Sequence, residues 1–197
     1  MSRLDQKRQT RQRILEGAGR GFRKGGYGGI GVDGLAKEAG VTSGAFYAHF
    51  PSKAHAFREA IVSGMQRLKD GICQFQQEYG RDWWQHFVHA YLNERRSCNL
   101  SESCVLPALT EEVVRSEHLA RKAFEKGLRE VATIIASGIE SPNAPKDTEA
   151  AYGALAMLLG GVTLARAVKD PVLAQAIATS VELALLPQPA RESSTTS

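Results

Sequence analysis

Apolar residues recur at intervals of three and four along almost the whole chain, and no segment sustains an alternation of polar and apolar residues. The first spacing places apolar side chains on one face of an α-helix, whereas alternation would indicate half-buried strands. The pattern therefore predicts an all-α protein. The hydrophobic content of 43% and the charged content of 23% are typical of a folded globular chain, which excludes disorder as the main state.

About nine helices are expected, separated by glycine, proline and polar turns. The expected breaks lie at residues 25–26, at Gly40, Pro51 and Gly80, at residues 93–103, at Ser116, and at residues 141–145 and 170–171. Side-chain hydroxyls can cap three of these helices, with Thr42 or Ser43 before the third, Ser52 before the fourth and Ser116 before a later one.

Positive charge is concentrated in the amino-terminal part of the chain. Residues 1–60 hold eleven Lys and Arg against five Asp and Glu, whereas residues 61–197 hold fourteen against sixteen. A basic module joined to a larger, slightly acidic body is typical of a nucleic-acid binder with a separate sensing or assembly domain. A solvated basic helix face without a nucleic-acid partner is the alternative interpretation.

Neither a membrane span nor a secretion signal is expected. The longest uncharged stretch, the sixteen residues between Glu149 and Arg166, is shorter than the ~20 apolar residues of a transmembrane helix. The first residues are basic and polar, without the apolar segment of a secretory signal. Three cysteines, Cys73, Cys98 and Cys104, are too few for a disulfide framework. We therefore expect a cytoplasmic protein.

Residues 32–53 contain a short helix, a Gly-Val turn and a second short helix inside the basic segment. This order is typical of a helix-turn-helix, whose second helix can enter the major groove of DNA. A two-helix turn used only for packing is the alternative. The candidate DNA-binding residues, nearly all small, hydroxyl-bearing or cationic, are Thr42, Ser43, Gly44, Ala45, Tyr47, His49 and Lys53.

Residues 10–57 closely resemble the DNA-binding domain of the TetR family of bacterial transcriptional regulators. The residues at that family's signature spacing are Val41, Gly44, Phe46, Tyr47, His49, Phe50, Ser52 and Lys53. The resemblance implies a homodimer in which each recognition helix, residues 42–49, enters one major groove of a palindromic double-stranded operator. It also implies that Tyr47, His49 and Lys53 contact mainly the DNA backbone, that Ser43, Gly44 and Ala45 face the bases, and that Phe46 and Phe50 belong to the core.

The same resemblance divides the chain into three parts. Residues 1–52 would form the DNA-binding domain, residues 53–186 a helical ligand-binding and dimerisation domain, and residues 187–197, which are rich in Pro, Ser and Thr, a disordered tail. The last two helices are apolar or small on most of their circumference, which suits burial against a second subunit. We therefore expect a homodimer formed through residues 148–186. The resemblance further implies an inducer pocket among the helices between residues 53 and 139.

An aromatic cluster follows Gly80, and aromatic walls are typical of small-molecule pockets as well as of ordinary cores. Trp83 and Trp84 point about 100° apart on a helix, so at most one of them is expected to face the same cavity as Phe87. The ligand-pocket candidates are Trp84, Phe87, Tyr91 and Cys104.

Cysteine and histidine chemistry provides further alternatives. Cys104 stands at the start of a predicted helix, where the helix dipole lowers the pKa of a thiol, and Cys98 follows two arginines. These positions leave open a thiol-based sensor of oxidants or electrophiles, although a buried Cys104 and an incidental exposed Cys98 are the ordinary interpretation. His86 and His89 are spaced to share a metal, but two ligands do not make a site, so no metal is expected.

The sequence therefore predicts a DNA-binding transcriptional regulator, a repressor released from its operator by an unidentified small-molecule inducer, with no cofactor. No His stands beside a Ser or Asp in a catalytic pattern, so no enzyme is expected. The alternatives from other classes are an all-helical small-molecule-binding enzyme with a vestigial helix-turn-helix, and an architectural protein that binds DNA without regard to sequence.

Overall fold

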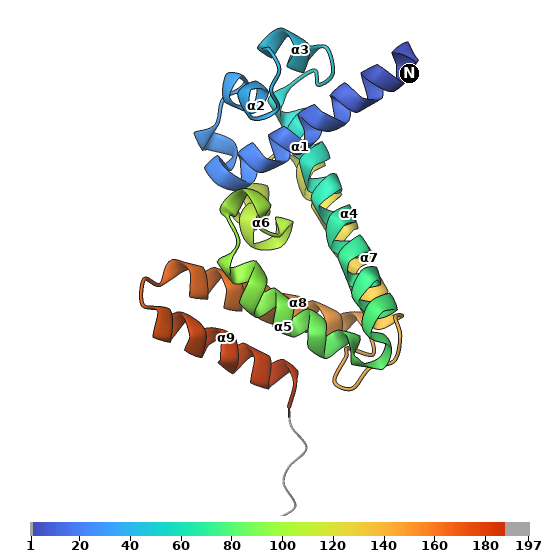
Figure 1. Ribbon diagram of the computed structural model, residues 1–197, viewed down its shortest axis with the longest axis vertical. Coiled ribbons are helices and arrows are strands. Elements are labelled where there is room, and N and C mark those ends of the chain that lie inside the picture. Colours follow the sequence, from blue (N-terminus) through green and yellow to red (C-terminus); the bar gives the residue numbers. More distant parts are fainter. Residues whose placement is uncertain (1, 188–197) are drawn as a thin grey trace, which may run out of the picture.

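The computed structural model describes residues 2–187 and confirms the all-α fold (Figure 1). Within these residues there are nine α-helices, two short 3-10 helices and no strand. The helices are α1 Arg3–Gly29, α2 Val32–Glu38, α3 Ser43–Tyr47, α4 Lys53–Tyr79, α5 Trp83–Ser97, α6 Val105–Val114, α7 His118–Ala136, α8 Thr148–Ala167 and α9 Pro171–Leu185, with η1 Gly80–Asp82 and η2 Leu100–Glu102 beside α5.

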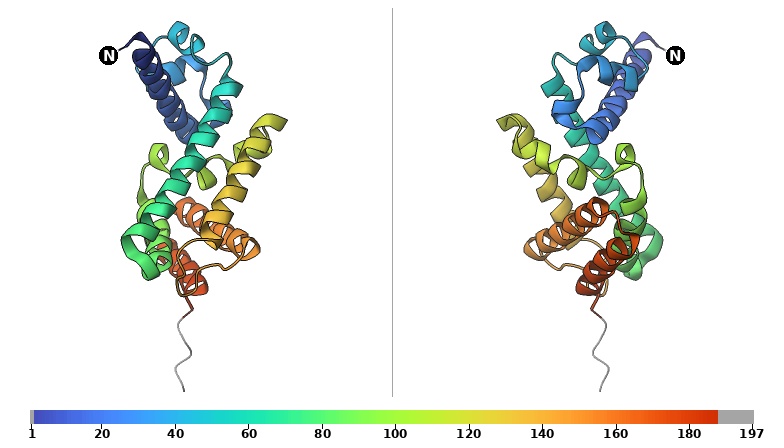
Figure 2. Two further views of the ribbon diagram at one scale, coloured as in Figure 1. Left: turned by 90° about the vertical axis from the view of Figure 1, so that its right-hand side faces the viewer. Right: turned by 90° about the vertical axis from the view of Figure 1, so that its left-hand side faces the viewer.

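The first three helices form one end of the molecule, and α4 leads from it into the helical body (Figures 1 and 2). The regular part of α1 ends at Gly26, whose φ of +70° lies in the left-handed region that favours glycine, near the expected break. Gly40, with φ +64°, ends α2 in the same way. The Thr42 hydroxyl then caps α3 by accepting a hydrogen bond from the Ala45 amide at 3.2 Å.

The long helix α4 begins and ends where the sequence predicts. The Ser52 hydroxyl accepts a hydrogen bond from the His55 amide at 3.1 Å, and Gly80, with φ +52°, ends the helix. Helix α4 packs along α7 in the body (Figure 1). A Cβ at Gly127 of α7 would lie 2.5 Å from the Met65 side chain, so the close approach of the two helices requires this glycine.

Two local predictions were wrong. Helix α5 continues to Ser97, although residues 93–103 were expected to form a loop, because Arg166 of α8 donates hydrogen bonds to the carbonyl oxygens of Arg95 and Cys98 at the end of the helix. Ser116 does not cap α7, since its hydroxyl donates to the Val113 carbonyl at 2.8 Å at the end of α6.

Helices α8 and α9 complete the body, and the carboxylates of Asp147 and Asp170 cap their first turns. By length and composition α8 is apolar enough to span a membrane. It packs against α5, α6, α7 and α9, as the inner helix of a bundle would. Its other face is also apolar and is exposed. The predicted disordered tail lies, apart from Pro187, outside the described residues.

Candidate nucleic-acid interface and ligand cavity

Helix α3 packs against the rest of the domain through aromatic side chains on one face and exposes its opposite face to solvent. Phe46 and Phe50 are completely buried and their rings lie 5.6 Å apart. Thr42 and Gly44 are exposed, and Tyr47 keeps 55% of its surface exposed. Helix α3 lies at one end of the molecule (Figure 1), and its first turn and Tyr47 are exposed there.

The remaining predicted contacts on α3 differ in their freedom to reach a ligand. The Ser43 hydroxyl donates a hydrogen bond to the Asp33 carboxylate of α2, so this side chain also ties the two helices together. Ala45 and His49 are half-buried. A Cβ at Gly44 would meet nothing closer than the Thr42 hydroxyl at 3.9 Å, so the fold itself does not require this glycine.

Lys53, at the start of α4, is positioned by an aromatic ring and not by a carboxylate. Its Nζ lies 4.5 Å from the centre of the Tyr27 ring, which packs in turn against Phe22 and Phe57. Within residues 2–187 no carboxylate lies within ion-pairing distance of Lys53. Its positive charge therefore remains available to an anion.

The first turns of α1 also carry cations. Arg3, Lys7 and Arg8 are exposed. The start of α1, which carries them, lies at the same end of the molecule as α3 (Figures 1 and 2). Arg11 is engaged instead, because it pairs with Glu59 at 3.0 Å and lies over the Phe50 ring. The spatial neighbourhood of these cations and α3 could not be read from their separation in sequence.

A cavity of about 210 Å³ lies between α1, α4, α5 and the segment that joins η2 to α6. Three of the four predicted pocket residues, Phe87, Tyr91 and Cys104, line it. Trp84 does not line it, since it is completely buried and its ring stacks on that of Phe87 with centroids 5.9 Å apart. Trp83 is also fully buried, and its indole N–H donates to the Ile139 carbonyl at 2.7 Å.

The expected acidification of the Cys104 thiol was wrong. Burial raises the pKa of Cys104, and this effect exceeds the opposing effects of the neighbouring Tyr91 hydroxyl and of the positive charges of Arg95 and Arg23. Cys98 lies elsewhere, at the end of α5, where its sulfur contacts Nη2 of Arg166 at 3.1 Å. The desolvation that dominates at Cys104 depends on tertiary packing, so its helix-start position alone could not reveal it.

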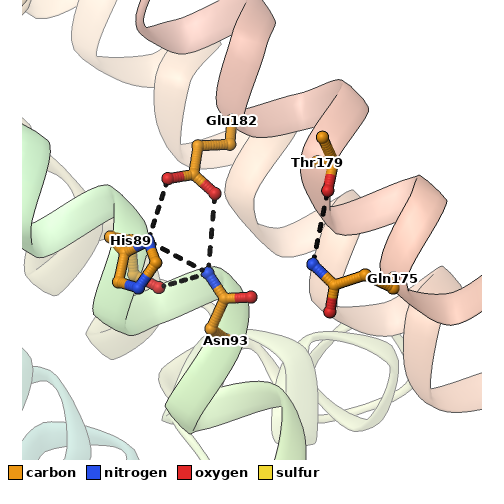
Figure 3. Close-up of polar contacts among 5 residues, drawn as sticks. All are labelled: His89, Asn93, Gln175, Thr179 and Glu182. Atoms are coloured by element: carbon orange, nitrogen blue, oxygen red, sulfur yellow. Dashed lines mark hydrogen bonds and ion pairs between the residues drawn. The ribbon is translucent and has the colours of Figure 1, made fainter. Parts of the chain in front are cut away.

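The two histidines of α5 have protein partners instead of a shared metal site. His86 stacks on Tyr79 with ring centroids 4.0 Å apart. His89 lies 3.0 Å from a carboxylate oxygen of Glu182 on α9, and Asn93 contacts both residues (Figure 3). In the part of the chain that the structure describes, no three metal-ligating side chains come together.

Residues 14–60 match a family model described as bacterial regulatory proteins of the tetR family. No curated protein matches the chain. Solved structures share the fold over most of its length. A TetR-family transcriptional regulator from Agrobacterium tumefaciens superposes with a TM-score of 0.70 at 18% identity, covering 89% of this chain and 97% of that one. The reduced form of E. coli NemR gives 0.71 at 19%, with coverages of 93% and 100%. FadR, a fatty acid degradation regulator from Bacillus halodurans, gives 0.65 at 18%, with coverages of 92% and 97%.

These likenesses agree with the geometry of the amino-terminal end. The family model spans the last part of α1, both short helices and the beginning of α4, which are the elements that support and present α3. Residues 14–60 therefore form a helix-turn-helix domain that is similar to that of the tetR family of bacterial regulatory proteins, on a body that shares the fold of solved members of that family.

Proposed function

We propose that the protein is a dimeric transcriptional repressor, which binds a palindromic operator and releases it when a small molecule enters the helical body. The observation that carries this proposal is the α2–α3 unit, whose second helix is exposed beside the basic start of α1 (Figure 1). A helix presented in this way can enter a major groove while neighbouring cations contact phosphates.

Within this interface the side chains take different roles. Gly44 lets the α3 backbone approach the bases, and Ser43 and Ala45 face them from the same turn. Tyr47, His49 and Lys53 contact the phosphate backbone, with Lys53 directed by the Tyr27 ring. The Thr42 hydroxyl caps α3 and so fixes the direction of its first turn.

The partner that covers the exposed apolar face of α8 is a second copy of the chain. Small and apolar residues repeat there at threes and fours, namely Gly153, Ala156, Met157, Gly160, Thr163, Leu164 and Ala167. Helix α9 adds Val172, which is 76% exposed, and Leu183, which is 57% exposed. An apolar stripe of this length on two neighbouring helices suits a helical bundle formed with the same two helices of a partner.

We accordingly propose that residues 1–52 bind DNA and that residues 53–186 bind the effector and form the dimer, in the cytoplasm where the DNA is. Two recognition helices must then match half-sites about 34 Å apart. An effector that binds better to a conformation with a different spacing lowers the operator affinity by its differential affinity. The raised pKa of the Cys104 thiol favours a bound ligand over an oxidant as the signal.

The proposal is tested by footprinting the full-length protein on DNA that flanks its own gene. We expect two protected, symmetry-related half-sites and a much weaker affinity for random DNA. Equal affinity for both would support the architectural alternative, and the absence of binding even at low salt would overturn the proposal. Turnover of a small molecule by the purified protein would support the enzyme alternative.

A glycine substitution sharpens this test. Gly44→Ala should leave the fold intact, because the added Cβ has free space, yet weaken operator binding by blocking the approach to the bases. Gly71→Ala, at another helical position with nothing within 4 Å, is the matched control and should bind DNA like the wild type. Identical operator affinity of the two variants would remove Gly44 from the interface.

A further inference from the structure

The cavity between the DNA-binding end and the body combines positive charge with an aromatic wall. Its apolar side is formed by Leu68, Phe75 and Phe87. Its polar side carries three guanidinium groups, those of Arg23, Arg67 and Arg95, against the two carboxylates of Glu94 and Glu102. Pockets of this composition fix the polar end of a ligand and bury its apolar end.

Arg23 is the buried cation of this set, since only 8% of its surface is exposed. Its Nε donates a hydrogen bond to the Ser101 carbonyl at 2.7 Å, but among residues 2–187 no carboxylate lies within 4.0 Å of its guanidinium. Burial, followed by repulsion from Arg67, lowers the pKa of Arg23 to about 10, against the attraction of Glu102. Arg23 therefore stays charged at neutral pH without a matching anion, which is a costly state for a buried group.

A second buried polar group, in the wall of the same cavity, makes no hydrogen bond of normal geometry to the residues that the structure describes. Tyr91 is 4% exposed, and in the described part of the chain its hydroxyl makes no hydrogen bond of good geometry. It lies beside the Cys104 thiol, which is a weak acceptor. A buried phenol without a partner is uncommon, because an unsatisfied hydroxyl costs free energy that a ligand atom can restore.

The volume of the cavity indicates the size of the ligand body that it can enclose. About 210 Å³ is somewhat more than the ~150 Å³ of a cavity that accepts benzene, and less than the ~300–1,000 Å³ of a typical drug-sized pocket. One ring or a chain of similar bulk, together with one polar group, fits this space.

We propose that the cavity binds a small monocarboxylate whose apolar body is about the size of one ring. The carboxylate pairs with Arg23 and accepts a hydrogen bond from the Tyr91 hydroxyl, while the apolar body lies against Phe75 and Phe87. This inference deepens the proposed function, on which its regulatory part rests, by naming the chemical class of the effector.

The position of Arg23 links this site to the DNA-binding end. Arg23 belongs to α1, whereas the carbonyl that it contacts belongs to Ser101 of η2, so its guanidinium joins the two parts of the molecule. A bound carboxylate accepts from the Nη groups of Arg23, which the Nε–Ser101 hydrogen bond leaves free, and so adds a second contact at the junction of α1 and the body. Occupation of the cavity therefore changes how α1 rests on the body, which is the change that a released repressor requires.

The experiment uses the full-length protein without DNA and benzoate as the probe, with heats of binding as the readout. We expect benzoate to bind the wild type, and neutral benzamide, which has the same shape, to bind at least ~10-fold more weakly, because a charge-assisted hydrogen bond is lost. Absence of benzoate binding at millimolar concentration, or equal affinity for benzamide, would overturn the proposal.

Variants of the two polar groups locate the site. Arg23→Gln should weaken benzoate binding ~10-fold or more, and Tyr91→Phe, which removes an unpaired hydroxyl and so spares the fold, about threefold to tenfold. Arg121→Gln, an exposed arginine on α7, is the matched control and should leave affinity unchanged. If Arg23→Gln does not fold, Tyr91→Phe decides alone, and wild-type affinity in that variant would refute the site.

Because these measurements need no operator, they separate the two proposals. Benzoate binding in a protein that binds no DNA would sustain the ligand site and refute the proposed function. Operator binding in a protein that ignores benzoate would do the reverse. Benzoate binding accompanied by release of the operator, lost in Tyr91→Phe, is the result that we expect.

Discussion

Leu164 offers a direct test of the dimer, because its side chain lies on the outer face of α8 with 59% of its surface exposed. Complete burial of a leucine stabilises by about 1.5–3 kcal/mol, so covering the exposed part contributes about 1–2 kcal/mol per copy. In a symmetric dimer the same residue is covered twice, which gives about 2–4 kcal/mol. Leu164→Gln should therefore raise the dimer dissociation constant by about 30-fold or more.

Glutamine is chosen because its helix propensity is close to that of leucine and it carries no charge to interact with the helix dipole. Folding of the single chain should thus change little. Leu119→Gln is the matched control, since Leu119 is a leucine with 50% of its surface exposed on α7, away from the proposed interface. It should leave both the dimer and the fold unchanged.

Sedimentation equilibrium over a range of protein concentrations measures the dissociation constant, and thermal unfolding by circular dichroism checks the fold. If Leu164→Gln and Leu119→Gln dissociate like the wild type, α8 does not form the interface and the proposed operator geometry loses its basis. A wild type that stays monomeric at all concentrations would have the same consequence.

Three further predictions concern the DNA-binding end and the cavity. Lys53→Ala should weaken binding to all DNA sequences alike and reduce the slope of log affinity against log salt by about 1; fluorescence anisotropy at several salt concentrations measures this, and an unchanged slope would remove Lys53 from the phosphate contacts. Gly17→Ala should lower the free energy of unfolding in denaturant by up to about 2 kcal/mol, because the new Cβ would lie 2.6 Å from the Ala39 Cα. The cost of overpacking, about 1–3 kcal/mol, outweighs the gain in helix propensity of about 1 kcal/mol. Higher stability than the wild type would contradict this reasoning. Burial raises the pKa of Cys104 and of Tyr91 in the folded state, so their neutral forms stabilise the fold fully at pH values below the unfolded-state pKa. The free energy of unfolding should therefore fall as the pH rises above about 8.5. Cys104→Ala should flatten this alkaline decline, and an equal decline in the variant and the wild type would refute the reasoning.

Local signals in the sequence predicted most of the fold. Gly40, Gly80 and the hydroxyls of Thr42 and Ser52 lie at helix ends because positive φ angles and free amide groups require such residues, whatever surrounds them. The spacing of apolar residues likewise identified the inner faces, since it depends only on the helical period.

Contacts between distant segments could not be predicted in this way. Helix α5 extends past Asn93 because Arg166, some 70 residues later, satisfies its last carbonyl groups. Trp84 stacks on Phe87 and does not line the cavity. Adjacent side chains on a helix, such as those of Trp83 and Trp84, face different neighbours, and the sequence does not show which of these neighbours encloses a cavity. The unpaired charge of Arg23 was likewise hidden, because only the tertiary structure buries it.

The absence of room for a side chain at Gly17 has a mechanical consequence. The α1 backbone packs directly against the backbone at Ala39, the end of α2, so no side chain between the two helices can change conformation to let them shift. Helix α3 is coupled to α2 through the hydrogen bond between Ser43 and Asp33. Helices α1, α2 and α3 must therefore rotate as one rigid unit if α1 tilts about Arg23. At a rise of 1.5 Å per residue, a tilt of about 5° there moves the far end of α1, about 30 Å away, by between 2 and 3 Å. Twofold symmetry would double that displacement between the two tips to about 4–6 Å, which exceeds the ~3.4 Å rise of one base pair.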